Sequence, residues 1–278
     1  MLDKWLQGAG APHLAIVGRS GAGKTSLAKR LMLYLLANEK NVTVLDFDGE
    51  YLDTPIPIIT PPFLIPPGVS LAWLLSQAAR PSGEEGMGGF GLAGLTSLLI
   101  EDSQDVQDVN AKIKELISAL RRDYTLPSTI RFGLLWRLMV FRKYFIVQDS
   151  ELPRNFVADV SSVLDVRERQ VTQQILASLI VHSHPTQSSD PLFLFVEEGV
   201  PGDWIRDLVI MSRRRGVRIV YISQSLPPSS VQSSFETIIF TPFLSPQRLP
   251  LSLPVDPAQD RGVWWTGVLG TRRLSLNI

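Results

Sequence analysis

The segment Gly18–Thr25 constrains the fold of this chain more than any other feature. It reads GRSGAGKT and has the pattern G-x-x-x-x-G-K-T, whose glycines let backbone N–H groups turn inward around phosphate oxygens. An apolar run, 13–17, precedes it, and leucines at helical spacing follow it. The N-terminal end of that helix would add a favourable dipole for an anion. The order strand, glycine-rich loop, helix therefore predicts a phosphate-binding site in an α/β fold.

The loop also assigns roles to particular side chains. Lys24 would bridge the β- and γ-phosphates of a nucleotide, and the Thr25 hydroxyl would bind Mg²⁺. The predicted cofactors are therefore ATP and Mg²⁺. The predicted nucleotide-binding residues are Gly18, Ser20, Gly21, Ala22, Gly23, Lys24, Thr25 and Ser26.

Two carboxylates follow a buried strand later in the chain. Five apolar residues, 192–196, end at Glu197 and Glu198, and the carboxyl ends of strands are where α/β sheets place their sites. We expect Glu197 to act through Mg²⁺ and its waters, and Glu198 to orient the attacking water. The alternative is a buried strand that happens to end in solvated acids.

The next strand ends in polar groups as well. Residues 219–223 lead into Gln224, whose amide could sense the γ-phosphate and report its loss. The alternative is an ordinary turn after a strand.

Strands alternate with helices along the chain, which predicts a mostly parallel sheet with helices on both faces. We expect one domain, 1–278, with a largely helical insertion at about 69–150 and a C-terminal strand pair or tail at 250–278. The segment 55–68 holds six prolines and is predicted to be a stiff, extended connection. The other expected strands are 41–47, 155–163, 217–223, 237–240 and a hairpin of 262–269 with 272–276 around residues 270–271; the expected helices are 69–77, 106–122, 131–145 and 167–181.

Composition excludes several classes of protein. The 27 basic and 27 acidic residues balance, so any nucleic-acid binding must come from local patches. The absence of cysteine excludes disulfides, thiol nucleophiles and thiolate zinc sites. Apolar runs are too short for an integral membrane protein, and the N-terminus shows no signal-peptide pattern. We expect a cytoplasmic or virion-associated protein.

Four segments together resemble the HerA/FtsK branch of P-loop motor ATPases, and HerA most closely. The first is His13-Leu-Ala-Ile-Val-Gly18, which leads into the phosphate loop. The second is Leu45-Asp-Phe-Asp-Gly-Glu-Tyr51, similar to an Asp-x-x-Gly-Glu-Tyr segment of HerA. The third is the pair Glu197-Glu198, and the fourth is the stretch 213–225 that ends in Ser-Gln-Ser.

The resemblance implies a P-loop NTPase of the RecA-like, additional-strand type. It further implies a hexameric ring that moves double-stranded DNA through its pore by ATP hydrolysis. Arg213 would reach the γ-phosphate of the neighbouring subunit in trans, although Arg214 or Arg215 could take this role because three successive arginines blur the register. Asp46 and Glu50 would steady the site or bind a basic neighbour. Pro12 stands where HerA proteins often have a second arginine.

The predicted biological process is viral genome packaging, because a single minimal motor of this kind is similar to viral genome-packaging ATPases, with capsid or membrane-vertex proteins as partners. The alternative is a plasmid or cellular HerA-like DNA-processing or segregation ATPase with a nuclease partner. A nucleotide-gated DNA-binding assembly factor with little turnover is a further alternative from a different class. The candidate DNA contacts are Arg121, Arg122, Arg142 and Lys143, and solvated helix faces are the alternative for these four. Trp264 and Trp265 are expected to cover core or a subunit contact, with stacking on bases as the alternative, and Arg272 and Arg273 could serve the same contact.

Overall fold

The computed structural model describes residues 13–65, 69, 73, 109–148, 153–185, 190–197, 203–240, 263–267 and 270–274. Most of the expected helix at 69–77 and the residue Glu198 lie outside these ranges. So do the side chains of the strands at 263–267 and 270–274. Within the described part, no helix is both long and apolar enough to cross a membrane.

A nine-stranded sheet with the order β11-β10-β9-β1-β8-β7-β2-β6-β3 forms the centre of the molecule. The strands from β9 to β3 pair in parallel, and β10 and β11 add antiparallel at one edge. The bounds are β1 (His13–Val17), β2 (Asn41–Asp46), β3 (Ile58–Ile59), β6 (Phe156–Asp159), β7 (Leu192–Glu197), β8 (Val217–Ser223), β9 (Phe235–Phe240), β10 (Val263–Gly267) and β11 (Gly270–Leu274). Because β8 inserts between β1 and β7, the sheet has the additional strand that the resemblance implies.

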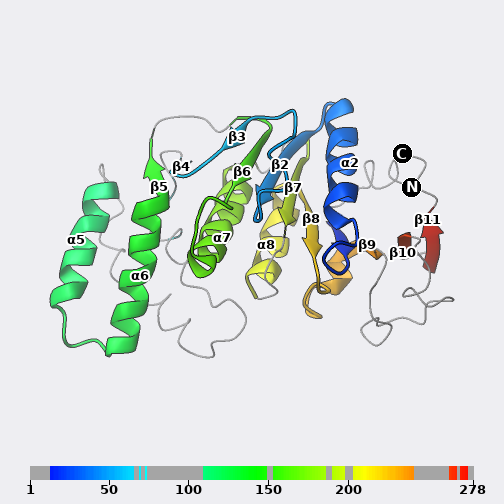
Figure 1. The fold of residues 1–278 in the computed structure, drawn as a ribbon. Coiled ribbons are helices and arrows are strands. Elements are labelled where there is room, and N and C mark those ends of the chain that lie inside the picture. The colour runs from blue at the N-terminus through cyan, green and yellow to red at the C-terminus, as the bar shows by residue number, and fades with distance from the viewer. Residues whose placement is uncertain are drawn as a thin grey trace.

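Helices cover both faces of this sheet, as expected for parallel strands. Alternate residues of β1 face opposite sides: Leu14 and Ile16 pack with α2 (Lys24–Ala37), whereas Ala15 and Val17 belong to the cluster on the other face. That second cluster contains α7 (Val166–Ser183) and α8 (Asp203–Arg214) (Figure 1).

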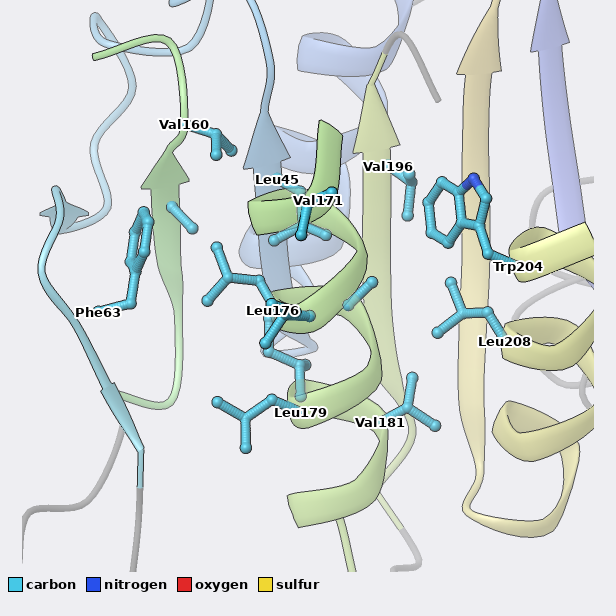
Figure 2. Close-up of a cluster of buried hydrophobic side chains, with 14 of the residues drawn as sticks. Leu45, Phe63, Val160, Val171, Leu176, Leu179, Val181, Val196, Trp204 and Leu208 are labelled. Atoms are coloured by element: carbon cyan, nitrogen blue, oxygen red, sulfur yellow. The ribbon is translucent and has the colours of Figure 1, made fainter. Parts of the chain in front are cut away.

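The cluster around α7 is the larger of the two cores. Leu176 and Leu179 of α7 lie among side chains of the sheet, with Trp204 and Leu208 of α8 beside them (Figure 2). Every residue of α7 from Val171 to Val181 is buried, because α6 and α8 flank the helix while the sheet lies behind it. This explains how four polar residues of α7, Thr172, Gln173, Gln174 and Ser178, come to be buried.

The described part of the expected insertion is helical. Helices α5 (Val109–Arg122) and α6 (Ser128–Tyr144) pack against each other and lie beyond the β3 end of the sheet, at the far side from β10 and β11 (Figure 1). A short strand, β5 (Phe145–Val147), follows α6 and pairs with β4 (Phe63–Ile65) in a separate two-stranded sheet.

Several boundaries differ from the prediction. The proline-rich segment is extended as expected, but it also contributes β3 and β4, which lie between its prolines. The strand predicted at 155–163 ends at Asp159, because the Asp159 carboxylate accepts the Ser161 N–H at 2.9 Å and closes a turn there. The C-terminal hairpin pairs Gly267 with Gly270, so residue 270, predicted to lie in the turn, belongs to β11.

Candidate nucleotide-binding site

The glycine-rich loop follows β1 directly and is anchored to the neighbouring strand. The Gly18 N–H donates to the Ser223 carbonyl of β8 at 3.2 Å. Gly21 and Gly23 have φ angles of 75° and 82°, in the left-handed region that L-residues with a Cβ rarely adopt. A Cβ at either position would meet no atom within 4 Å. The glycines are therefore required by the backbone path of the loop and not by lack of space.

The N-terminus of α2 has no side-chain cap. Its N-cap residue is Gly23, which offers no acceptor to the first turn. By contrast, the N-terminus of α7 is capped by Asp165, whose carboxylate accepts the N–H groups of Arg167 and Glu168, each at 2.9 Å. Helix N-terminal N–H groups that no side chain satisfies favour an anion. The α2 terminus therefore fits the phosphates of a nucleotide.

A cavity of about 270 Å³ lies against this loop and collects most of the predicted site. Its lining combines loop residues with side chains from the ends of β2, β7 and β8, which no short-range motif joins. The lining residues are Ser20, Gly21, Gly23, Lys24, Thr25, Ser26, Asp48, Glu50, Glu197 and Gln224. Gly18 and Ala22 do not line it; the Ala22 N–H donates within the loop, to the Arg19 carbonyl at 3.2 Å.

Thr25 and Glu197 meet in the lining of this cavity. The Thr25 hydroxyl donates to Glu197 Oε1 at 2.8 Å, although the two residues are 172 positions apart. Glu197 is the last residue of β7 and is buried, and the side-chain amide of Gln173 donates to its carbonyl at 2.7 Å. A hydroxyl and a carboxylate held together beside a phosphate loop are the oxygen ligands, direct or through water, that Mg²⁺ prefers. The pair fits Mg²⁺.

Lys24 and Gln224 complete the predicted polar lining. Lys24 is buried, and its ammonium donates to the Arg19 carbonyl at 3.2 Å, on the loop itself. Gln224 follows β8 directly and lines the cavity from the strand that separates β1 from β7. Glu198 lies outside the described residues.

An acidic loop at 47–53 forms another wall. Asp46, at the end of β2, is buried and accepts the N–H groups of Gly49, Glu50 and Tyr51 at 2.8, 3.0 and 2.8 Å. Burial raises the pKa of the Asp46 carboxyl against the lowering effect of these three bonds, and nearby Asp159 raises it further. Asp46 therefore supports the turn and does not line the cavity, whereas Glu50 does.

Two residues of this segment have roles that were not predicted from the sequence. Asp48 lines the cavity, and Tyr51 is fully buried against the α2 side of the sheet. Burial raises the pKa of the Tyr51 phenol well above its usual value, and the carboxylates of Glu197 and Asp46 add to this. Both residues lie inside the Asp-x-x-Gly-Glu-Tyr segment, and this pattern was the feature of the sequence that could have indicated them.

The three successive arginines lie at the opposite edge of the sheet. α8 leads from the carboxyl end of β7 back to the start of β8, so its C-terminal end is remote from the phosphate loop of its own chain. Arg213 and Arg214 are exposed there. Arg215 instead donates to the carbonyls of His182 and His184 at the end of α7, so its guanidinium is engaged within the chain.

The candidate DNA contacts divide in a similar way. Arg121, Arg122 and Arg142 are exposed on α5 and α6. Lys143 is also exposed, but it forms an ion pair with Glu168 of α7 at 2.9 Å. Near the α5–α6 turn, the Arg131 guanidinium lies 4.9 Å from the ring centre of the exposed Tyr124.

The sheet order and the cavity define the fold of a P-loop NTPase of the additional-strand type. A family model described as "Helicase HerA, central domain" matches residues 9–69, which carry β1, the phosphate loop and the acidic loop. This confirms the HerA-like resemblance over that segment. No curated protein matches the sequence.

Solved structures share the fold at low sequence identity. VirB4 of Thermoanaerobacter pseudethanolicus matches with a TM-score of 0.63 and 13% identity, over 94% of this chain and 88% of that one. The plasmid coupling protein TrwB, in complex with the GTP analogue GDPNP, matches with a TM-score of 0.53 and 15% identity, over 82% and 69%. A weaker similarity, with a TM-score of 0.43 at 11% identity over 94% of this chain and 95% of that one, is to the genome packaging NTPase B204 of Sulfolobus turreted icosahedral virus 2.

Proposed function

We propose that this chain hydrolyses ATP and uses the energy, as a ring, to translocate double-stranded DNA. The observation that carries the ATPase part is the junction of Thr25 and Glu197 in one cavity with the phosphate loop. Bound Mg²⁺–ATP would supply the phosphoryl group and the charge neutralisation for its transfer to water. The residues of the chain would bind the nucleotide and the metal and orient the attacking water.

Each polar side chain of the cavity has a separate task in this proposal. Lys24 would contact the β- and γ-phosphates in place of the Arg19 carbonyl, and Thr25 and Glu197 would hold Mg²⁺, directly or through water. Glu198, the next residue along the chain, orients the attacking water. Gln224 senses the γ-phosphate from the end of β8 and passes its loss to that strand.

The ring part rests on the position of the arginines. Arg213 is exposed at the sheet edge remote from the phosphate loop, so it can serve a nucleotide only on a neighbouring copy. A guanidinium supplied in this way stabilises the negative charge of the transferring phosphoryl group. Its presence raises kcat by a factor of about 10³–10⁵. Arg214 is exposed beside it and is the alternative donor, whereas Arg215 is held by α7. We propose a hexamer.

The DNA part rests on the family match and on the exposed cations of α5 and α6. A motor that moves along any sequence needs contacts to phosphates rather than to base edges. The exposed Arg121, Arg122 and Arg142 provide such contacts. Genome packaging with capsid or membrane-vertex partners, and plasmid or cellular DNA processing with a nuclease partner, both use this activity.

The test measures mass by light scattering and ATP turnover, with and without linear duplex DNA. We expect a hexamer-sized species whose turnover rises with DNA. Lys24→Ala should lower turnover at least about a hundredfold at unchanged mass, since the lysine acts on the transferring phosphoryl group. Lys40→Ala, at the other end of α2, is the matched control and should turn over as the wild type does.

Arg213→Ala distinguishes a role in catalysis between subunits from a role in folding or assembly. Turnover should be lost while the hexamer persists, because the guanidinium acts on the neighbour's nucleotide and not on assembly. A monomer whose ATP turnover is negligible and does not change when DNA is added would contradict the motor and favour a nucleotide-gated assembly factor.

A further inference from the structure

The acidic loop 47–53 brings Asp48 and Glu50 to the cavity, yet it belongs to no helix or strand. Three features hold it. Asp46 caps its backbone from below. On the α2 side, Lys29 pairs with Asp53 at 2.7 Å, an exposed ion pair. On the α7 side, Arg169 contacts it from the first turn of the helix.

Arg169 joins two loops that lie next to each other at the carboxyl edge of the sheet. Its Nη1 donates to the Phe47 carbonyl at 3.2 Å and lies 3.4 Å from the Asp48 carboxylate. Its Nε and Nη2 donate to the carbonyls of Val163 and Ser161, at 3.0 and 3.1 Å. The guanidinium carbon also lies 5.1 Å from the ring centre of Phe47.

These contacts depend on the shape of the arginine side chain. A guanidinium presents five donors in a planar fork, so one side chain can satisfy three carbonyls and a carboxylate that diverge from each other. The Arg169 side chain is only 15% exposed. If it is removed, water therefore has little access to the carbonyls and the carboxylate that lose their hydrogen bonds. The Asp46 carbonyl accepts the Val160 N–H at 2.9 Å and joins the two loops where they begin. Arg169 joins them further along, between Phe47–Asp48 and Ser161–Val163, where the Lys29–Asp53 pair makes no contact.

We propose that Arg169 is a positioning residue of the nucleotide site: it holds the acidic loop 47–53 in the place where Asp48 and Glu50 line the cavity. It acts through that loop and does not line the cavity itself. The inference deepens the proposed ATPase function and rests on it for its effect on turnover. Its structural part, the hold on the loop, stands apart from that function.

The experiment compares Arg169→Ala and Arg169→Lys with the wild-type protein. Hydrogen–deuterium exchange of the nucleotide-free protein reads the hold on residues 47–53 directly. Steady-state kinetics then read its consequence. In Arg169→Ala we expect faster exchange in 47–53 and a fall in kcat of about tenfold or more, with KM for ATP within about threefold, since the phosphate loop is untouched.

Arg169→Lys keeps the positive charge, so it can still be measured if Arg169→Ala fails to fold. Its ammonium cannot span the four acceptors, so exchange and kcat should change in the same direction by less. Arg154→Ala is the matched control: Arg154 bonds Asn41 and Asp190 at the amino edge of the sheet, and its removal should leave both readouts unchanged.

Unchanged exchange in 47–53 for folded Arg169→Ala would overturn the proposal, as would faster exchange with an unaltered kcat. A wild-type protein without ATP turnover would instead defeat the proposed function. In that case the exchange measurement alone decides whether Arg169 holds the loop.

Discussion

The two edges of the central sheet differ in the kind of backbone group that each must satisfy. At the carboxyl edge the strands end and the helices begin, so unpaired N–H groups collect there, and carboxylates of Asp46, Asp159 and Asp165 accept them. At the amino edge the helices end, so carbonyls collect there. Arg215 donates to the last carbonyls of α7.

This contrast explains where the nucleotide site lies. Among the helix N-termini at the carboxyl edge, α7 has the Asp165 cap, whereas α2 begins at Gly23 with no side-chain cap. The acceptor missing at α2 is what the phosphates of a nucleotide provide. At the amino edge, Arg215 and the buried His13 bond backbone groups of the fold, whereas Arg213 and Arg214 are exposed and are the residues that we propose to act on a neighbouring subunit.

His13→Ala should have the largest effect on stability and tests the amino edge. His13 is fully buried, and its Nδ1 accepts the Ile219 N–H of β8 at 3.1 Å. Its removal leaves a cavity and an unsatisfied N–H group, so the free energy of unfolding should fall by about 2–4 kcal/mol. Urea unfolding measures this, with the half-buried His184→Ala as control. Equal effects of the two substitutions would contradict the role given to His13.

The pH dependence of stability should also come from the amino edge. Burial, with the charges of Arg213 and Arg218, lowers the pKa of His13 from 6.5 to about 3. The unfolded chain therefore binds a proton below pH 6.5 that the folded chain excludes. Stability contributed by neutral His13 is complete above pH 6.5 and falls as the pH drops towards 3, by about 1.4 kcal/mol per pH unit.

Urea unfolding at pH 4.5, 5.5 and 6.5 measures this slope. His13→Asn should reduce it, because asparagine does not titrate in this range. A smaller slope of the same sign should remain, because burial also lowers the pKa of His182 and of His184. A variant with the full wild-type slope would show that another group is responsible.

Asp165→Ala should have the smallest effect and sharpens the comparison between α2 and α7. Loss of the cap should lower the free energy of unfolding by about 1 kcal/mol, the usual contribution of an N-cap side chain. Nucleotide affinity should stay unchanged, because Asp165 does not line the cavity. Thermal unfolding and binding of a fluorescent ATP analogue measure the two quantities. A loss of affinity with little loss of stability would mean that the N-terminus of α7 also takes part in nucleotide binding.

Local sequence patterns were sufficient for the elements and for part of the site. The phosphate loop could be predicted because its conformation depends on residues within eight positions, two of them glycines in the left-handed region. Glu197 could be predicted because a run of apolar residues fixes where a buried strand ends. Asp48 and Arg169 were not predicted, since their roles depend on which loops become neighbours after folding.

The sequence by itself determined the strand, loop and helix of the phosphate site, since each follows from periodicity or from backbone conformations that only certain residues adopt. The position of Glu197 follows from the apolar run 192–196, whereas the additional-strand class was implied by the resemblance to HerA. The tertiary structure decided which of these groups meet. It placed Glu197 on Thr25 across 172 positions, buried Asp46 as a support of the acidic loop, and engaged Arg215 while it left Arg213 exposed. Such contacts depend on strand order and loop packing, and no local spacing in the chain encodes them.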